Sequence, residues 1–328
     1  MISFRYLIVT LVAVFLALGL GVLAGTTVLD QGLVSTLKRQ THEAERRASA
    51  VQDDLVTAKT TASQLQAFVT EAAPFLIQDK LAGQRVVIVT YDGSDPTARN
   101  EAVGALQQAG ADLVAVLSVT DRMAAADPSS RSDLAALLGI PVETAPTPTA
   151  GSSPRASPGT DHLVRQAAAE VANRLALGGR ATGPAPRKSA DLLSALLEKG
   201  FLKSSVSPGD IPSVGGPNQV VLVLTGGTQP PPVPDSEFML PLVEALGQHP
   251  ATWLAVGESA EHKDDPLVQV VRSDASLSAG QMVTVDDLDP EHFGGIQLVL
   301  GLDALIADGR GGNYGIESGS EGLLPKAG

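Results

Sequence analysis

The stretch Asp286–His292 contains the densest group of acidic side chains in this chain. Of the kinds of functional site that the sequence could contain, the residue types and spacing of this stretch best resemble a metal site. Asp287, Asp289 and Glu291 alternate as the oxygen ligands of a calcium loop do, and His292 adds an imidazole. His292 also stands where the sharp turn of such a loop needs glycine. We therefore name Asp287, Asp289, Glu291 and His292 as candidate metal ligands, with a solvated acidic turn that caps a helix as the alternative.

Other kinds of site chemistry find little support in the sequence. The chain has no cysteine, four methionines and five dispersed histidines, which excludes disulfides, thiol nucleophiles and thiolate metal sites. The stretch Gly257–Glu261 approaches a nucleophile elbow but lacks its second glycine. Asp92-Gly93 and Gly226-Gly227 follow the two strongest strand patterns without forming a phosphate-loop motif, so we expect tight turns there. We expect no catalytic residue and no resident cofactor, and we predict that the protein is not an enzyme.

The negative charge of the chain is concentrated in its last third. Residues 206–328 hold four Lys and Arg against seventeen Asp and Glu, which accounts for the whole net charge of −13. Such a surface repels nucleic acid, so we expect no nucleic-acid partner. It could attract cations or a basic partner, or serve solubility alone.

Strand-like and helix-like patterns alternate from residue 84 to residue 306. The strands and helices that they predict would hold the residues of any functional site in place. This order predicts a three-layer α/β domain with a mainly parallel sheet over residues 82–328, or two smaller domains divided near residue 150. The segment 141–160 is rich in Pro, Ser and Thr, and we expect a mobile loop there. The expected strands are 84–91, 112–119, 219–225, 251–256 and 282–285, and the expected helices are 97–109, 121–138 with an interruption at Pro128, 161–177, 190–202, 237–248, 266–272 and 296–306.

A long apolar run precedes this domain. Residues 7–29 carry no charge, and at about 1.5 Å per residue they reach across a hydrocarbon core of about 30 Å. Arg5 precedes the run and Asp30 follows it at once, which favours residues 1–6 in the cytoplasm and the bulk of the chain outside. We therefore predict a single-pass protein of the cell membrane. A buried core helix and a signal peptide removed after Ala24 are the alternatives.

A seven-residue apolar repeat follows the apolar run, over residues 30–78, with Val34 at an a position. Most charged residues fall outside the a and d positions, which predicts a parallel coiled coil between copies of the chain. Small residues at every fourth position of the apolar run would let two such helices approach closely. The alternative is a single amphipathic helix packed on its own domain. The residues expected at the interface between copies are Ala17, Gly21, Gly25, Val34, Leu37, Val51, Leu55, Leu65 and Val69.

The two ends of the chain carry a resemblance to a known family. Met1–Tyr6, followed by Val12–Val22, and a tail with Tyr314-Gly315 and Gly322–Pro325 resemble the actinobacterial MctB-like family of copper transport outer membrane proteins. The order of anchor, rod, α/β domain and glycine-rich end is similar over the whole chain. The family pattern usually has His after Tyr6, and Leu7 stands there in this sequence, so one candidate metal ligand near the membrane is missing.

The resemblance implies copper transport or copper homeostasis in the cell envelope, with copper as the metal. The residues themselves do not provide a pore, because one helix cannot enclose a channel and a barrel needs many alternating strands. Three hypotheses follow: a copper-export protein, a coiled-coil scaffold or regulator of envelope assembly or cell division that recruits another envelope protein, and an enzyme without a recognisable motif.

Overall fold

The computed structural model describes residues 4–140, 158–179, 191–227, 229–259, 266–274, 277, 282–290 and 293–326, with the backbone alone at residues 4, 158 and 208 and over residues 25–37. The chain divides into two compact units, Met1–Phe68 and Val69–Gly328. The predicted loop at 141–160 lies outside the described residues up to residue 157, and residues 158–160 belong to a helix.

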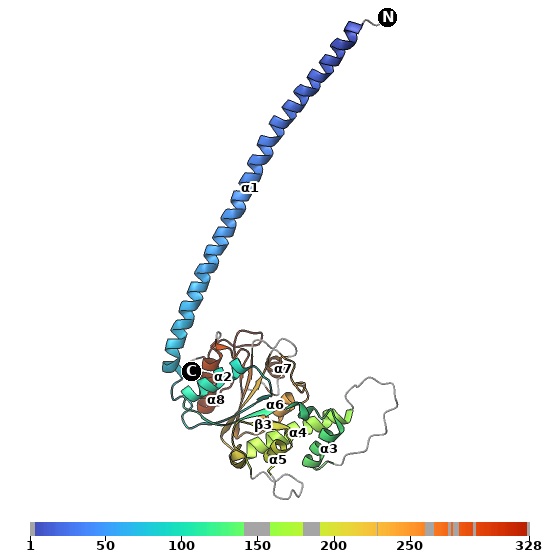
Figure 1. The fold of residues 1–328 in the computed structure, drawn as a ribbon. Coiled ribbons are helices and arrows are strands. Elements are labelled where there is room, and N and C mark those ends of the chain that lie inside the picture. Colours follow the sequence, from blue (N-terminus) through green and yellow to red (C-terminus); the bar gives the residue numbers. More distant parts are fainter. Residues whose placement is uncertain are drawn as a thin grey trace. The chain divides into compact units, whose positions relative to one another are not determined.

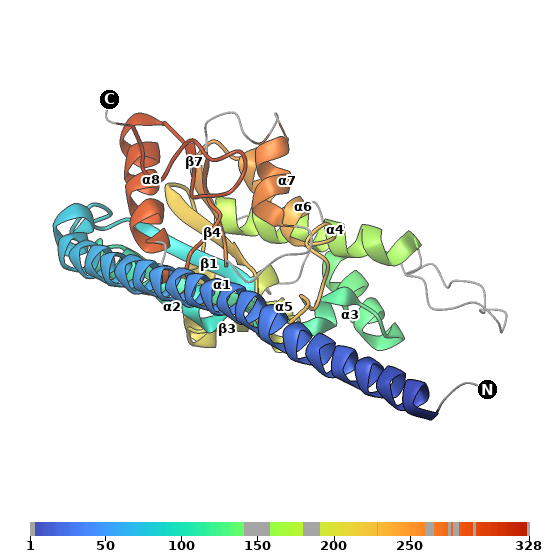
Figure 2. The same ribbon diagram turned by 90° about the horizontal axis from the view of Figure 1, so that it is seen from above.

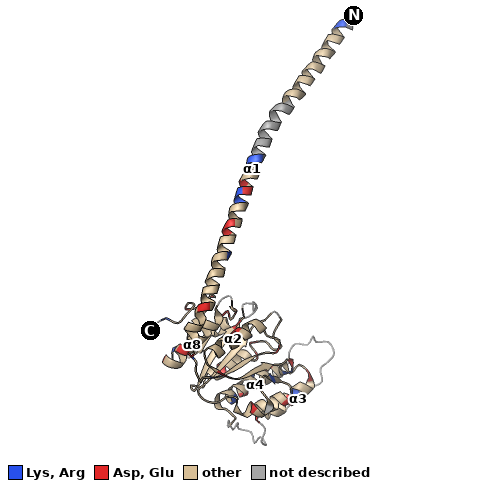
Figure 3. Ribbon diagram, turned by 60° about the vertical axis from the view of Figure 1, so that its left-hand side comes forward, with Lys and Arg blue, Asp and Glu red and all other residues tan. Residues whose placement is uncertain are grey.

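The first unit is made by helix α1 (Phe4–Ile77), whose last turns belong to the second unit. Its apolar part, Arg5–Ala24, has a mean hydropathy of 2.8 and is not buried within the protein. In Figure 3 the described part of α1 beyond its blue N-terminal end is first tan, and blue and red segments appear in the part of the helix nearer the α/β domain. The predicted N-terminal apolar helix is thus confirmed. The helix contains Pro74 in its last turn and ends at Ile77.

The second unit is built on one sheet. In the part of the chain that the structure describes, its strands lie in the order β3-β2-β1-β4-β5-β6-β7. Neighbouring strands are parallel except β2 and β3, which are antiparallel. The mainly parallel sheet is therefore confirmed. The strands are β1 (Arg85–Tyr91), β2 (Asp112–Val119), β3 (Leu202–Ser204), β4 (Gln219–Thr225), β5 (Thr252–Glu258), β6 (Met282–Val285) and β7 (Gly312–Tyr314).

Helices cover both faces of this sheet (Figures 1 and 2). Alternate residues of β1 enter different cores, with Val87 and Val89 on one face and Val86 and Ile88 on the other, and all four are at most 1% exposed. The face with Val86 is covered by α2 (Pro96–Gln108) and α8 (Gly294–Asp308). The opposite face is covered by α3 (Pro128–Leu138), α4 (Pro158–Leu177), α5 (Leu192–Glu198), α6 (Met239–Gly247) and α7 (Leu267–Ser273). The strands of the described residues all belong to one sheet, and Val69–Gly328 forms one compact unit.

The helix predicted over 190–202 is shorter than expected. It begins after its N-cap Asp191 and ends at Glu198, because Gly200 adopts a left-handed conformation with φ of 74°. Leu202 then begins the edge strand β3, which the sequence analysis placed at the end of this helix. The glycine-rich tail likewise contains β7, a strand that the sequence analysis did not predict.

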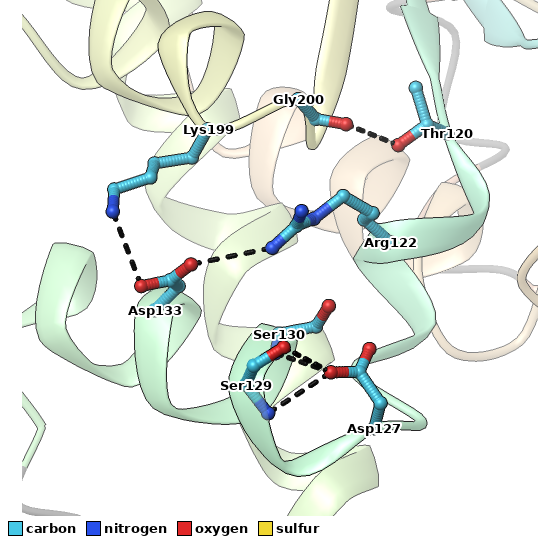
Figure 4. Close-up of polar contacts among 8 residues, drawn as sticks. All are labelled: Thr120, Arg122, Asp127, Ser129, Ser130, Asp133, Lys199 and Gly200. Carbon is cyan, nitrogen blue, oxygen red and sulfur yellow. Dashed lines mark hydrogen bonds and ion pairs between the residues drawn. The ribbon is translucent and has the colours of Figure 1, made fainter.

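Side-chain contacts tie α3 and α5 to the end of β2 (Figure 4). The Asp133 carboxylate on α3 accepts from Arg122 and from Lys199, each at 3.3 Å. The Thr120 hydroxyl donates to the carbonyl oxygen of Gly200 at 2.7 Å. These contacts hold the β3 edge in place although β3 pairs over only three residues.

Candidate functional site

The structure contains a cavity at the carboxyl ends of the neighbouring strands β1 and β4, where the strand order changes direction. After β1 the chain builds the sheet outward through β2 and β3, whereas β4 pairs on the other side of β1 and leads to β5, β6 and β7. Ligands of such doubly wound sheets bind at the carboxyl ends of the two central strands. A cavity of about 260 Å³ lies there, lined by Tyr91, Asp92, Gly93, Ser94, Gly226, Gln229, Pro230, Pro231, Pro232 and Asp235.

Two tight turns shape the floor of this cavity. Gly93 and Gly226 have φ values of 86° and 102°, so the predicted turns after β1 and β4 require glycine. A Cβ atom on Gly227 would lie 3.2 Å from the backbone nitrogen of Asp95, which shows how closely the two loops approach. The Asp95 carboxylate caps α2 by accepting from the Thr97 backbone at 2.8 Å and also accepts from the Ser259 hydroxyl at 2.7 Å.

Oxygen-bearing side chains face this cavity. The side chains of Tyr91 and Asp235 are 3% and 8% exposed, respectively. Burial, then the negative charge of Asp235 and the hydrogen bond between the two side chains, raise the pKa of Tyr91 well above its ordinary value. At the mouth, Asp92 pairs with Lys203 at 2.6 Å, and both side chains are substantially exposed.

A second buried carboxyl group ends the next strand, β5. Glu258 is 2% exposed and accepts from the backbone nitrogen of Val268 at 3.3 Å. Burial, and then the charges of Asp235, Glu317 and Asp286, raise the pKa of Glu258 to about 8. Glu258 therefore holds its proton at neutral pH.

The carboxylate that follows β6 is bound by an arginine. Arg272 on α7 donates to Asp286 at 2.7 Å, and the two side chains are 3% and 0% exposed. The backbone nitrogens of Ile316 and Glu317 also donate to Asp286, each at 3.0 Å. This fully buried pair is a structural clamp that joins α7, β6 and the loop after β7.

The acidic stretch proposed as a metal loop is only partly described. Asp287 is 5% exposed and accepts from the backbone nitrogen of Asp289 at 3.0 Å, which forms a turn. The Asp287 end of this turn is buried, because Gly294 at the start of α8 lies close to the Asp287 carbonyl, whereas Asp289 is partly exposed and Pro290 is exposed. Glu291 and His292 lie outside the described residues, so the metal assignment stays a prediction.

The described residues offer few ligands for a soft metal. Met123, Met239 and Met282 are all at most 5% exposed and belong to the hydrophobic core around the sheet. His42 lies on α1 beside Glu45, and His249 contacts the Asn173 side chain at 2.9 Å. Over the described ranges, no group of three or more His, Asp or Glu side chains is placed to hold a metal ion.

The residues predicted to join copies of the chain all lie on α1. Val51, Leu55 and Leu65 are 67%, 52% and 58% exposed. Ala17 is also exposed, and space is open around Gly21, where an added Cβ would meet nothing within 4 Å. The side chains of Gly25, Val34 and Leu37 lie outside the description, and Val69 packs partly against the core beside α2 and α8.

The sequence analysis predicted the turns of the cavity but not its key side chains. Tyr91 was part of a predicted strand, and Asp235 lies between the predicted strand 219–225 and the predicted helix 237–248. Only their positions along the chain could have indicated these residues. Tyr91 ends β1 and Asp235 follows β4, and the carboxyl ends of parallel strands lie at one edge of the sheet, where ligands bind. No pattern in the residues around Glu258 indicated that its side chain would be buried.

These features define a class of protein: an α/β domain with a doubly wound, mainly parallel sheet, preceded by a long helix whose apolar part could cross a membrane. Comparison with known proteins gives the family. Residues 1–325 match the family described as "Copper transport outer membrane protein, MctB", and the chain belongs to this family.

Named relatives agree with this assignment. The chain is 28% identical over 328 residues to the "Copper transporter MctB" of Mycobacterium tuberculosis, covering 98% of each chain. It is 27% identical over 335 residues to the protein of the same name from Mycobacterium leprae, covering 98% of this chain and 99% of that one. The resemblance drawn from the two ends of the sequence is therefore confirmed over nearly the full length. The family is named for copper transport rather than for an enzymatic activity.

Proposed function

We propose that this protein takes part in copper transport across the cell envelope as a membrane-anchored accessory protein, with copper as its cargo. Membership of the copper transport family over residues 1–325 is the observation that carries the proposal. The apolar helix Arg5–Ala24 supplies the anchor, with the N-terminus in the cytoplasm and the α/β domain outside.

The proposed role is accessory because the described residues contain one helix that could cross a membrane, and a single helix offers no enclosed path for an ion. The described methionines are buried, and thioethers in a core do not ligate a passing copper ion. Copper contact is therefore assigned to oxygen and imidazole ligands, and Asp287, Asp289, Glu291 and His292 remain the candidates from the sequence.

The test is deletion of the gene in the source organism, followed by measurement of cell-associated copper under copper load. We expect the deletion strain to retain more copper than its parent. The full chain should restore the parental level, whereas a chain with Leu11, Val14 and Leu18 replaced by Asp should fail to do so because it cannot insert. Unchanged copper together with chained or misshapen cells would contradict the proposal and support the scaffold hypothesis.

We also propose that α1 pairs in parallel with α1 of a second copy. The exposed Val51, Leu55 and Leu65 support this, because apolar side chains at a and d positions are stable when a partner helix covers them. Another envelope protein with a matching helix could take the same place.

The chain has no cysteine, so a single introduced cysteine reports pairing without background. We expect Val51→Cys, at a d position, to form a disulfide-linked dimer in membranes under mild oxidation. Asp53→Cys lies on the opposite side of the helix and serves as the matched control. Equal crosslinking of the two variants would contradict the parallel pairing.

A further inference from the structure

We propose that two copies of this chain pair in register along α1 through ion pairs between Asp54 of one copy and Lys59 of the other. The inference rests on the parallel pairing of α1 proposed above. It adds the contact that decides which residues of the two helices lie opposite each other.

The middle of α1 is not covered by any described part of its own chain. Every residue from 38 to 68 is exposed, and these residues include the apolar Val51, Leu55 and Leu65. Helices in proteins owe most of their stability to the packing of an apolar side against another element. A second helix that covers these side chains would therefore stabilise this part of α1.

The charges beside the apolar seam indicate that the second helix is another copy of α1. In the seven-residue repeat with Val34 at an a position, Asp54 is a g residue and Lys59 is the e residue five positions later. In a parallel coiled coil a g residue faces the following e residue of the partner helix, and opposite charges attract there. Two-fold symmetry produces this contact twice, so one pair of copies gains two such ion pairs.

Their own helix gives neither of these two charges a partner. Side chains three or four positions apart meet on the surface of a helix, and all residues at those distances from Asp54 and from Lys59 are uncharged. Both side chains are exposed. They differ in this from His42 and Glu45 on the same helix, which contact each other at 3.2 Å. Asp54 and Lys59 are therefore placed to contact a partner helix.

These ion pairs also fix the register of the two helices. The e residues one repeat before and one repeat after Lys59 are Gln52 and Gln66. If one helix is shifted by seven residues, the a and d positions still face each other, but Asp54 then faces an uncharged glutamine. Two copies anchored in one membrane by Arg5–Ala24, as proposed above, run parallel, so the in-register arrangement is the one that gains both ion pairs.

The experiment measures partner choice in membranes. Two forms of the full chain, Asp54→Lys and Lys59→Asp, are expressed together with tags of different size, each in the Val51→Cys background. Disulfide-linked pairs are then counted after mild oxidation. Each form repels a copy of itself, whereas a mixed pair has two attractive contacts. We expect mixed pairs to make up at least about four fifths of the linked dimers, against about half for random pairing, even if each exposed ion pair is weak.

The matched control mixes Asp53→Lys with Arg46→Asp, which make the same charge changes at f positions on the outer side of the helix. Mixed pairs should remain at about half of the linked dimers in this control.

A chain with both Asp54→Lys and Lys59→Asp should link to itself as efficiently as the parent with Val51→Cys, because the two charges are exchanged and the attraction is restored. Mixed pairs at about half in the first mixture, with normal linking of the parent, would overturn the ion pairs and leave the parallel pairing of α1 in place. Failure of the parent with Val51→Cys to link at all would overturn the pairing itself and the ion pairs with it.

Discussion

The buried carboxyl group of Glu258 makes the stability of the α/β domain depend on pH near neutrality. Burial, and then the neighbouring carboxylates, raise the pKa of Glu258 from its ordinary value of 4.5 to about 8. Between these two values the folded state holds a proton that the unfolded state releases. Stability is therefore greatest below pH 4.5 as far as this group is concerned, and it falls as the pH rises towards 8.

The magnitude follows from the two pKa values. One pKa unit corresponds to about 1.4 kcal/mol, so the whole titration amounts to about 5 kcal/mol, of which about 3 to 4 kcal/mol falls between pH 5 and pH 8. This is a large share of a typical unfolding free energy of about 5–15 kcal/mol. Glu258 is 2% exposed, so solvent screening reduces the effect little.

Glu258→Gln tests this reasoning because glutamine keeps the shape and does not titrate. Its side-chain oxygen can still accept from the Val268 backbone nitrogen. We expect the variant to match the parent near pH 5 and to exceed it by about 3 kcal/mol at pH 8. The assay is denaturant unfolding of the full chain in detergent, followed by the fluorescence of Trp253 on β5, at several pH values.

Glu244→Gln, on the exposed side of α6, is the control and should keep the pH dependence of the parent. The reasoning is refuted if Glu258→Gln shows the same slope of stability against pH as the parent. It is also refuted if the variant is less stable than the parent at pH 8.

Three further changes should alter stability in the same assay. Arg272→Met should cost about 3–5 kcal/mol, because it leaves the fully buried carboxylate of Asp286 without its cation; a loss below 1 kcal/mol would argue against the clamp. Gly104→Ala, on the exposed side of α2 with open space around it, should stabilise by about 0.5–1 kcal/mol. Gly301→Ala makes the same exchange in α8, where the new Cβ would lie 2.7 Å from the ring of Tyr314, and it should destabilise by about 1–3 kcal/mol. Shifts of the same sign in both glycine variants would contradict the packing of α8.

Local sequence patterns predicted the elements that form from their own residues. The central strands β1 and β4 are continuous apolar runs, as expected for strands buried on both faces, and their predicted bounds differ by at most one residue from those observed. The apolar part of α1 was equally evident, because a long uncharged run of apolar residues is a property of neighbouring residues. The turn glycines Gly93 and Gly226 were also predicted from their positions after these strands.

Only the tertiary structure decided the short edge strands and the chemistry of the cavity. The strands β3 and β7 have three residues each and exist because β2 and β6 offer them hydrogen-bond partners, which no local pattern records. Tyr91, Asp235 and Glu258 are far apart in sequence, and folding buries them at one edge of the sheet. The sequence by itself determined which segments are apolar and how they alternate, since these are properties of neighbouring residues. Which carboxyl groups lose contact with water was decided by packing, because burial and the charges of distant residues set their pKa values.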